Sequence, residues 1–356
     1  MSRERVAVAL SGGVDSSVAA CVLQEAGYEV IGVTMRLWSE EEATPSDQRH
    51  PHSSARGIHD AEELCSSLGI PFHLIGLEDE FKHYVIDYFC QEYARGRTPN
   101  PCVACNQHIK FGSLLDQALS LGADYLATGH YARIQHSDGT YHLLKGVDPD
   151  KDQSYMLYTL GQGKLEHLLF PLGDYLKAQV RELAREKGLP TAGKPSSQDI
   201  CFISGDYGAF LRRYSTTTSG EIVSQQGEVL GEHKGTAFHT VGQRHGLGIA
   251  AAERLYVTKI EPGANRLTVG TEEELYSSGF VASKVNWVSG QPPSEPIRVA
   301  VKIRYRSPQV AATLRPKPDS AEIEFHQPQR AVTPGQAVVF YQHSEVLGGG
   351  TIANQE

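Results

Sequence analysis

This chain lacks long apolar runs, an excess of positive charge and a cysteine framework, and each absence excludes a class of protein. No run of about 18 apolar residues occurs and no charged-then-apolar signal pattern begins the chain, so we expect no membrane insertion or secretion and predict a cytoplasmic protein. The net charge of −9 has the wrong sign for a protein that coats nucleic acid, so any RNA contact needs a local basic patch. Six cysteines in 356 residues argue against a disulfide framework and for buried, metal-binding or catalytic thiols.

The first half of the chain alternates short apolar runs with helical stretches. We expect strands at Val6–Leu10, Tyr28–Thr34, Phe72–Gly76 and Asp124–Thr128, with a helix at Ile58–Leu68. Strands interleaved with helices indicate βαβ units and a parallel sheet, so the fold class is α/β. On such a sheet a ligand lies at the carboxyl ends of the strands.

The pattern changes after about residue 150. Helical segments are expected around Gln153–Leu169 and Leu176–Lys187, and from about Gly220 onward many short strands with turn signals indicate a small β-barrel. The clearest of these strands are Leu255–Ile260, Arg266–Val269, Arg298–Tyr305 and Ala337–Tyr341. We therefore predict a parallel-sheet domain over residues 1–210, a small central domain over 211–277 and a C-terminal β-barrel over 278–356.

Directly after the first apolar run comes Ser11-Gly12-Gly13-Val14-Asp15-Ser16-Ser17. The adjacent glycines allow a sharp turn whose N–H groups reach a phosphate, and Ser16 and Ser17 add hydroxyls at a helix start. The run lacks the Gly-Lys-Ser/Thr end of a Walker loop and the glycine spacing of a dinucleotide fingerprint. It is most similar to the pyrophosphate loop of enzymes that split ATP between its α and β phosphates, the alternative being an ordinary glycine turn. We expect ATP bound with magnesium, for which Asp15 is a candidate ligand.

Two separated cysteine motifs form a second candidate site, after the glycine loop. Cys102 and Cys105 lie in a loop with two prolines just before the helical pattern Ile109–Leu119, and Cys201 follows a polar run. Cys105 best fits a helix N-terminus, where the dipole favours the thiolate. A structural zinc pair is the alternative, but a second close pair is missing. The other cysteines fall within helical patterns and are expected to be inert.

A basic stripe is expected on the strand that contains Arg298, Lys302, Arg304 and Arg306. Strand periodicity places these four side chains on one face, where they either contact phosphates or form a solvated face. Tyr305 points to the other face of a regular strand, so if it also contacts RNA the strand must end or bulge there.

Motifs in order along nearly the whole chain resemble those of the tRNA-specific 2-thiouridylase (MnmA) family. They are Ala9–Ser17, Thr98–Pro101, Cys105–Asn106, Lys110–Gly112, Thr128–Arg133, Lys151–Tyr155, Ser197–Phe202, Gly242–Arg244 and Gly348–Gly350. The resemblance implies an ATP-binding catalytic domain of the pyrophosphate-loop ATPase type, a small central domain and a C-terminal β-barrel that contributes to tRNA binding.

The resemblance also implies a reaction, in which sulfur replaces the 2-oxygen of the wobble uridine in tRNA. ATP would adenylate that oxygen, and a persulfide on Cys201 would deliver sulfur to the activated carbon, giving 2-thiouridine, AMP and pyrophosphate. Cys105 would attack the persulfide to release sulfur or would close a disulfide with Cys201. A cysteine desulfurase or a sulfur-relay protein would load Cys201, and the accepted tRNAs would be those for lysine, glutamate and glutamine.

The site residues implied by the resemblance fall into two groups. The ATP-binding group is Ala9, Leu10, Ser11, Gly12, Gly13, Val14, Asp15, Ser16, Met35 and Gly129. The tRNA-binding group is Asn100, Pro101, Cys102, His130, Lys151, Asp152, Gln153, Arg304, Tyr305 and Gln336. The remaining histidines, including His50, His52 and His59, show no metal-ligand spacing, and no metal ligand is assigned to them.

Cys102 departs from the best-known branch of the family, which has an aspartate at this position. A thiol there puts an acid/base role in doubt and creates a trio with Cys105 and Cys201. Three thiolates could instead hold an iron–sulfur cluster with one iron open; we favour the persulfide. Two other classes stay open: an amide-forming ligase, which has no use for the two catalytic thiols, and a non-catalytic RNA-binding protein.

Overall fold

The N-terminal part of the computed structural model is a five-stranded parallel sheet in the order β3-β2-β1-β4-β7. The structure describes residues 3–38, 55–194, 200–203, 207–214 and 218–354. The strands of this sheet are β1 Arg5–Ala9, β2 Glu29–Arg36, β3 Phe72–Gly76, β4 Tyr125–Ala127 and β7 Leu168–Leu169.

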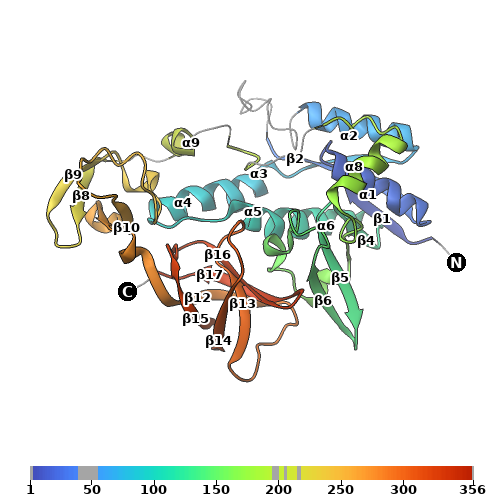
Figure 1. Cartoon of the computed structure of the whole chain (residues 1–356). Helices are drawn as coiled ribbons and strands as arrows, with labels where there is room; N and C mark the ends of the chain where they lie inside the picture. Colours follow the sequence, from blue (N-terminus) through green and yellow to red (C-terminus); the bar gives the residue numbers. More distant parts are fainter. Residues whose placement is uncertain (1–2, 39–54, 195–199, 204–206, 215–217, 355–356) are drawn as a thin grey trace.

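Helices cover both faces of this sheet because successive residues of β1 point to opposite sides. Val6 and Val8 pack with α1 Val14–Glu25, α2 Ala55–Leu68 and α8 Lys177–Glu186, which lie together in Figure 1. Ala7 packs against the helices on the other face. These are α3 Glu78–Phe81, η2 Lys82–Asp87, α4 Tyr88–Ala94, α5 Pro101–Ala104, η3 Cys105–Leu114 and α6 Leu115–Ser120.

The central part is a small four-stranded sheet in the order β10-β11-β8-β9, preceded by α9 Tyr207–Tyr214. Its core is formed by buried aliphatic side chains such as Ile222, Val257 and Leu267. The strands are β8 Gly220–Ser224, β9 Val229–His233, β10 Tyr256–Glu261 and β11 Arg266–Gly270, and the short 3₁₀ turns are η5 Thr236–Phe238, η6 Pro262–Ala264 and η7 Glu273–Leu275.

The C-terminal part is an antiparallel barrel, which β12 closes by pairing with both β15 and β17. Its strands are β12 Tyr276–Trp287, β13 Ile297–Lys302, β14 Val310–Pro316, β15 Ser320–Arg330, β16 Ala337–Gln342 and β17 Glu345–Ile352. A hairpin from the first half of the chain, β5 Ala132–Ser137 and β6 Thr140–Lys145, extends the barrel sheet beside β17 (Figure 1). The predicted α/β domain, central domain and C-terminal barrel are confirmed.

Two predicted elements differ from the structure. The helix expected over Gln153–Leu169 is replaced by a 3₁₀ turn η4 Ser154–Leu157, the single turn α7 Gln162–Leu165 and strand β7. Strand β13 ends at Lys302, so Arg304 and Arg306 leave the strand and the predicted four-residue basic stripe is wrong. None of the helices in the described part of the chain is long and apolar enough to cross a membrane.

Candidate functional site

The predicted phosphate loop between β1 and α1 is a backbone turn that suits an anion. Gly12 has a φ of +68°, and a Cβ there would lie 2.7 Å from the carbonyl oxygen of Gly57 in α2, so the position requires glycine. Gly13 is the N-cap of α1, and no side chain among the described residues caps it. The first N–H groups of α1 therefore remain available to a phosphate.

The serine hydroxyls of the loop hold the turn itself. Ser16 Oγ and Ser17 Oγ both donate to the carbonyl oxygen of Gly13, at 3.1 and 2.9 Å, and Ser17 is fully buried. The Ser11 N–H donates to Ser16 Oγ at 3.2 Å. Both hydroxyls thus help to shape the loop, and their contribution to phosphate binding stays a prediction.

The other predicted ATP-binding residues lie beside this loop at the carboxyl ends of neighbouring strands. Ala9 ends β1, the Leu10 N–H donates to Val33 O at 2.8 Å, and Met35 lies near the end of β2. Gly129 follows β4, and a Cβ there would lie 2.9 Å from the backbone nitrogen of Ser16. Because β2 and β4 flank β1, this edge of the sheet is the topological switch point where ligands bind.

Asp15 has two protein partners in the structure. Its Oδ1 accepts a hydrogen bond from Lys177 Nζ at 2.5 Å and one from the Tyr131 hydroxyl at 2.9 Å. Lys177 begins α8, far along the chain, and sequence reasoning missed it because no spacing links it to the loop. The structure thus adds a lysine and a tyrosine to the predicted site.

The cysteine loop is the start of a helix that begins earlier than predicted. Asn100 is the N-cap of α5, with its Oδ1 accepting the Val103 N–H at 3.3 Å, and Pro101 occupies the first turn. Cys102 therefore lies in the first turn and Cys105 in the second, where the π-helix η3 begins. The prediction that Cys105 lies at the helix N-terminus is wrong, since Asn100-Pro101 provides the earlier start.

The three predicted thiols lie near one another, with Cys105 buried and Cys102 and Cys201 half-buried. Burial raises the pKa of Cys105 to about 11 and raises the pKa of Cys201 and Cys102 as well. Cys201 is also influenced by the charges of Cys105 and Cys102, while Lys110 lowers the pKa of all three thiols. The sequence predicted a pKa of Cys105 lowered by the helix dipole, and burial reverses this. The motif residues 197–199 lie outside the described residues.

His130 lies in a buried aromatic setting after β4. Thr128 Oγ1 and His130 Nδ1 are 2.7 Å apart, and the rings of Phe111 and Phe170 lie next to the imidazole. Burial, and then the charge of Lys110, hold the pKa of His130 well below its usual value. The lowered pKa favours the neutral imidazole near pH 7, and its contacts are the hydrogen bond with Thr128 and the two aromatic rings.

Tyr131 connects the phosphate loop to the predicted RNA-binding residues. Its hydroxyl bonds Asp15, and its N–H donates to Gln153 Oε1 at 3.0 Å. The Gln153 N–H returns a hydrogen bond to the carbonyl oxygen of Tyr131 at 2.9 Å. One buried residue thus contacts both loops.

Asp152 shapes the loop that follows Lys151. The Lys151 side chain is half-buried. Asp152 Oδ1 accepts the Ser154 N–H at 3.1 Å, and the Tyr305 hydroxyl donates to Asp152 O at 3.3 Å. Lys302 lies over the ring of Tyr305, 5.6 Å from its centroid. Because β13 ends at Lys302, Tyr305 leaves the barrel sheet and reaches this loop. A strand that ends before Tyr305 is one of the two conditions that the sequence set for an RNA contact by this residue.

Arg304 and Gln336 line a cavity of about 570 Å³ between the central domain and the barrel. Arg304 donates to Ala331 O and to Thr333 Oγ1, and Gln336 Nε2 donates to Thr98 O at 3.1 Å. Gln336 therefore fastens the barrel to the N-terminal part, whereas the bonds of Arg304 stay within the barrel. The cavity also has Gln243, His245 and Arg330 in its wall, so it is rich in hydrogen-bond donors.

Comparison with known proteins assigns the family. Models described as tRNA methyl transferase HUP domain, tRNA methyl transferase PRC-barrel domain and Aminomethyltransferase beta-barrel domain match residues 4–205, 208–271 and 277–352. A relative named tRNA-specific 2-thiouridylase MnmA, from Carboxydothermus hydrogenoformans, is 48% identical over 99% of this chain and 98% of its own. Relatives of the same name are 47% identical in Pelotomaculum thermopropionicum (99% and 98% covered) and 49% identical in Magnetococcus marinus (98% and 99% covered). The chain belongs to the tRNA-specific 2-thiouridylase family.

The protein is thus a member of a family of enzymes. The roles assigned to individual residues, and the domain boundaries drawn at 210 and 278, remain proposals. The structure adds their positions: the three thiols lie near one another, and the predicted RNA-binding residues are hydrogen-bonded through Tyr131 to the predicted phosphate loop.

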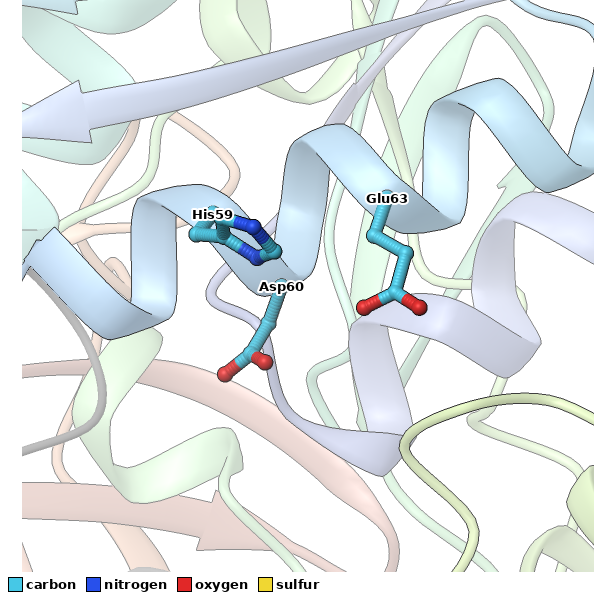
Figure 2. Close-up of side chains that lie close together, drawn as sticks. All are labelled: His59, Asp60 and Glu63. Atoms are coloured by element: carbon cyan, nitrogen blue, oxygen red, sulfur yellow. The ribbon is translucent and has the colours of Figure 1, made fainter.

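A further group of side chains on α2 has the composition of a metal site. Figure 2 shows His59, Asp60 and Glu63 on one helix, with their ligand atoms within 4.8 Å of one another. His59 and Glu63 are exposed, and Asp60 is already paired with Lys194. Exposed acidic groups commonly lie together without a metal, so no ion is assigned at this helix.

The Cys105 thiolate is expected to form only at high pH. Since its pKa is raised to about 11, its thiolate fraction should rise about tenfold per pH unit across the neutral range. Lys110→Gln removes the cation that lowers this pKa, so the titration should move to still higher pH. The measurement is thiolate ultraviolet absorbance against pH, taken as the difference from the matching Cys105→Ser protein.

Lys259→Gln is the matched control, because Lys259 is an exposed lysine of the central sheet paired with Glu261. It should leave the titration unchanged. A wild-type midpoint near the ordinary thiol value, or an unmoved midpoint in Lys110→Gln, would contradict this account of the thiol group.

Proposed function

We propose that this protein is an ATP-dependent tRNA 2-thiouridylase that replaces the 2-oxygen of the wobble uridine with sulfur. The observation that carries the proposal is the proximity of the buried Cys105 to the half-buried Cys102 and Cys201, near the predicted RNA-binding residues. The family models carry methyl transferase in their descriptions, but the relatives that match end to end are named 2-thiouridylases, and three gathered thiols suit sulfur transfer.

The first step is activation of the uridine by ATP. The uridine 2-oxygen forms a bond to the α-phosphorus of ATP, and the bond to pyrophosphate breaks. The uncapped N–H groups of α1 and the glycine at position 12 suit the phosphates, while Met35 and Gly129 flank the nucleotide. Magnesium bound with ATP would neutralise phosphate charge, and Asp15 is the loop carboxylate that would hold it.

The second step is sulfur transfer by the two thiols. The outer sulfur of a Cys201 persulfide forms a bond to carbon 2 of the uridine, and AMP leaves. The Cys105 thiolate then attacks the Cys201 sulfur, breaking the S–S bond and leaving 2-thiouridine and a Cys105–Cys201 disulfide. A thiol reductant restores the disulfide to two thiols, and a cysteine desulfurase or a sulfur-relay protein supplies the next persulfide. Alternatively, Cys105 attacks the persulfide first and releases sulfide.

The substrate residues divide between the helix start and the adjoining loops. Asn100, Pro101 and Cys102 would lie at the target base, and the neutral His130 would contact the RNA by hydrogen bonding. The rest of the tRNA would contact Lys151-Asp152-Gln153, Arg304-Tyr305 and Gln336. We propose the tRNAs for lysine, glutamate and glutamine as substrates in the cytoplasm.

The same three thiols are also a donor set for an iron–sulfur cluster with one open iron. Cys102→Asp separates the two routes, because an aspartate removes one thiolate and leaves the persulfide pair intact. We expect this variant to keep 2-thiouridine formation within about tenfold of the wild type. Anaerobically purified proteins are compared for bound iron and for product. Loss of both iron and activity in Cys102→Asp would favour the cluster.

The test of the function is mass-spectrometric detection of 2-thiouridine in unmodified tRNA. The wild-type protein is incubated with ATP, cysteine and a cysteine desulfurase, and omission of ATP is the control. Product that depends on ATP supports the proposal. No product with a competent sulfur donor would favour the ligase alternative, and no ATP consumption with any tRNA would favour a non-catalytic RNA-binding protein.

A further inference from the structure

The phosphate loop carries no cation of its own. Residues 9–17 contain one aspartate and no lysine or arginine, and the hydroxyls of Ser16 and Ser17 are used within the turn. A triphosphate placed there would meet backbone N–H groups and the carboxylate of Asp15. Besides the magnesium bound with ATP, any positive side chain for the phosphates must therefore come from elsewhere in the fold.

Among the described residues, Lys177 and Lys194 from later in the chain reach the loop, and they have different hydrogen-bond partners. Lys194 Nζ donates to Gly12 O at 2.8 Å and also pairs with Asp60, so it fastens the loop backbone to α2. Lys177 Nζ has one hydrogen-bond acceptor among the described residues, Asp15 Oδ1. An ammonium has three donors, so two donors of Lys177 remain for a ligand.

Lys177 is firmly positioned beside the first turn of α1. Its backbone N–H donates to Asp148 Oδ2 at 2.8 Å, and its ammonium lies 5.8 Å from the ring centroid of Tyr131. Only 11% of its side chain is exposed. An ion pair between this buried ammonium and the partly exposed Asp15 contributes little net stability, because both charges lose some water, so stability alone does not account for this lysine.

We propose that Lys177 binds the phosphates of ATP. When the nucleotide is bound, the Lys177 ammonium contacts both Asp15 and the phosphates. The inference rests on the proposed function in that ATP occupies the loop. Lysine suits this role because its compact ammonium acts as a point charge toward phosphate. Asp15 then keeps the ammonium in place before the nucleotide arrives, which avoids an ordering cost on binding.

The test compares the affinity for MgATP with the affinity for adenosine by titration calorimetry in the full-length protein. We expect Lys177→Gln to weaken MgATP binding by about 10- to 100-fold, the loss of one charge-assisted hydrogen bond, while adenosine binding stays unchanged. Lys177→Arg keeps the charge and should recover most of the affinity. Equal MgATP affinity in Lys177→Gln and wild type would overturn the inference.

The matched control is Lys187→Gln. Lys187 is the C-cap of α8 and pairs with Glu25, the last residue of α1. This pair therefore lies at the end of α1 away from the loop. It should leave MgATP affinity unchanged, which separates loss of a phosphate contact from loss of an ion pair between these helices. An equal drop in both variants would show a structural role and overturn the inference.

The double variant Asp15→Asn/Lys177→Gln addresses folding, because it leaves neither charge unpaired. If Lys177 binds phosphate, the double variant should still bind MgATP weakly; if Lys177 only neutralises Asp15, wild-type affinity should return and the inference fails. A wild-type protein that binds no MgATP, with or without tRNA, would overturn the proposed function as well, so the two failures are distinguishable.

Discussion

Replacing Cys201 by serine is expected to lower 2-thiouridine formation at least about a thousandfold while sparing the activation of tRNA by ATP. A serine hydroxyl cannot carry a persulfide, and Cys201 is the thiol from which sulfur is proposed to move. The phosphate loop and its partners lie in other elements, so tRNA-dependent exchange of pyrophosphate into ATP should continue. The two readouts are the mass of the modified nucleoside and the exchange of labelled pyrophosphate.

Cys90→Ser is the matched control for this variant. Cys90 is also a half-buried thiol with a pKa raised to about 11 by burial, but it lies in α4 and has no proposed role. It should form product at close to the wild-type rate. Full activity in Cys201→Ser, or an equal loss in Cys90→Ser, would contradict the persulfide assignment.

Gly12→Ala is expected to weaken MgATP binding by about 100-fold or more. The new Cβ would lie 2.7 Å from the carbonyl oxygen of Gly57, and a φ of +68° costs a non-glycine residue about 1–2 kcal/mol. The loop must shift away from α2, which moves the N–H groups that are proposed to bind the phosphates. Calorimetric titration with MgATP and thermal unfolding measure the two effects.

Gly27→Ala separates strain from loss of the site. Gly27 follows the other end of α1 with a φ of +93°, and nothing lies within 4 Å of a Cβ placed there. This variant should lose stability in proportion to the strain and keep its MgATP affinity. If Gly12→Ala binds MgATP as well as Gly27→Ala does, the loop is not the phosphate site.

Sequence patterns within a short segment predicted the elements whose own residues favour that structure. The strand Phe72–Gly76 was predicted with the bounds of β3, and the glycine turn before α1 was recognised from two adjacent glycines after an apolar run. The expected helix over Gln153–Leu169 failed because its apolar residues pack in a 3₁₀ turn and in β7, which pairs only with β4. The hairpin β5–β6 was not predicted, and its pairing with the distant β17 is not encoded locally.

The sequence by itself predicted the glycine turn before α1 and the order of the domains, because these depend on residue type and short spacing, and its resemblance to the family singled out the three thiols. The tertiary structure alone decided their environment. Burial, which no local pattern reports, raises the pKa of Cys105 where the helix dipole was expected to lower it. Chain folding brings Lys177 to Asp15 and Tyr305 to Asp152, over separations that no sequence period spans. Whether a lysine neutralises a loop carboxylate depends on their distance in space, so only the fold could identify Lys177 as the partner of Asp15.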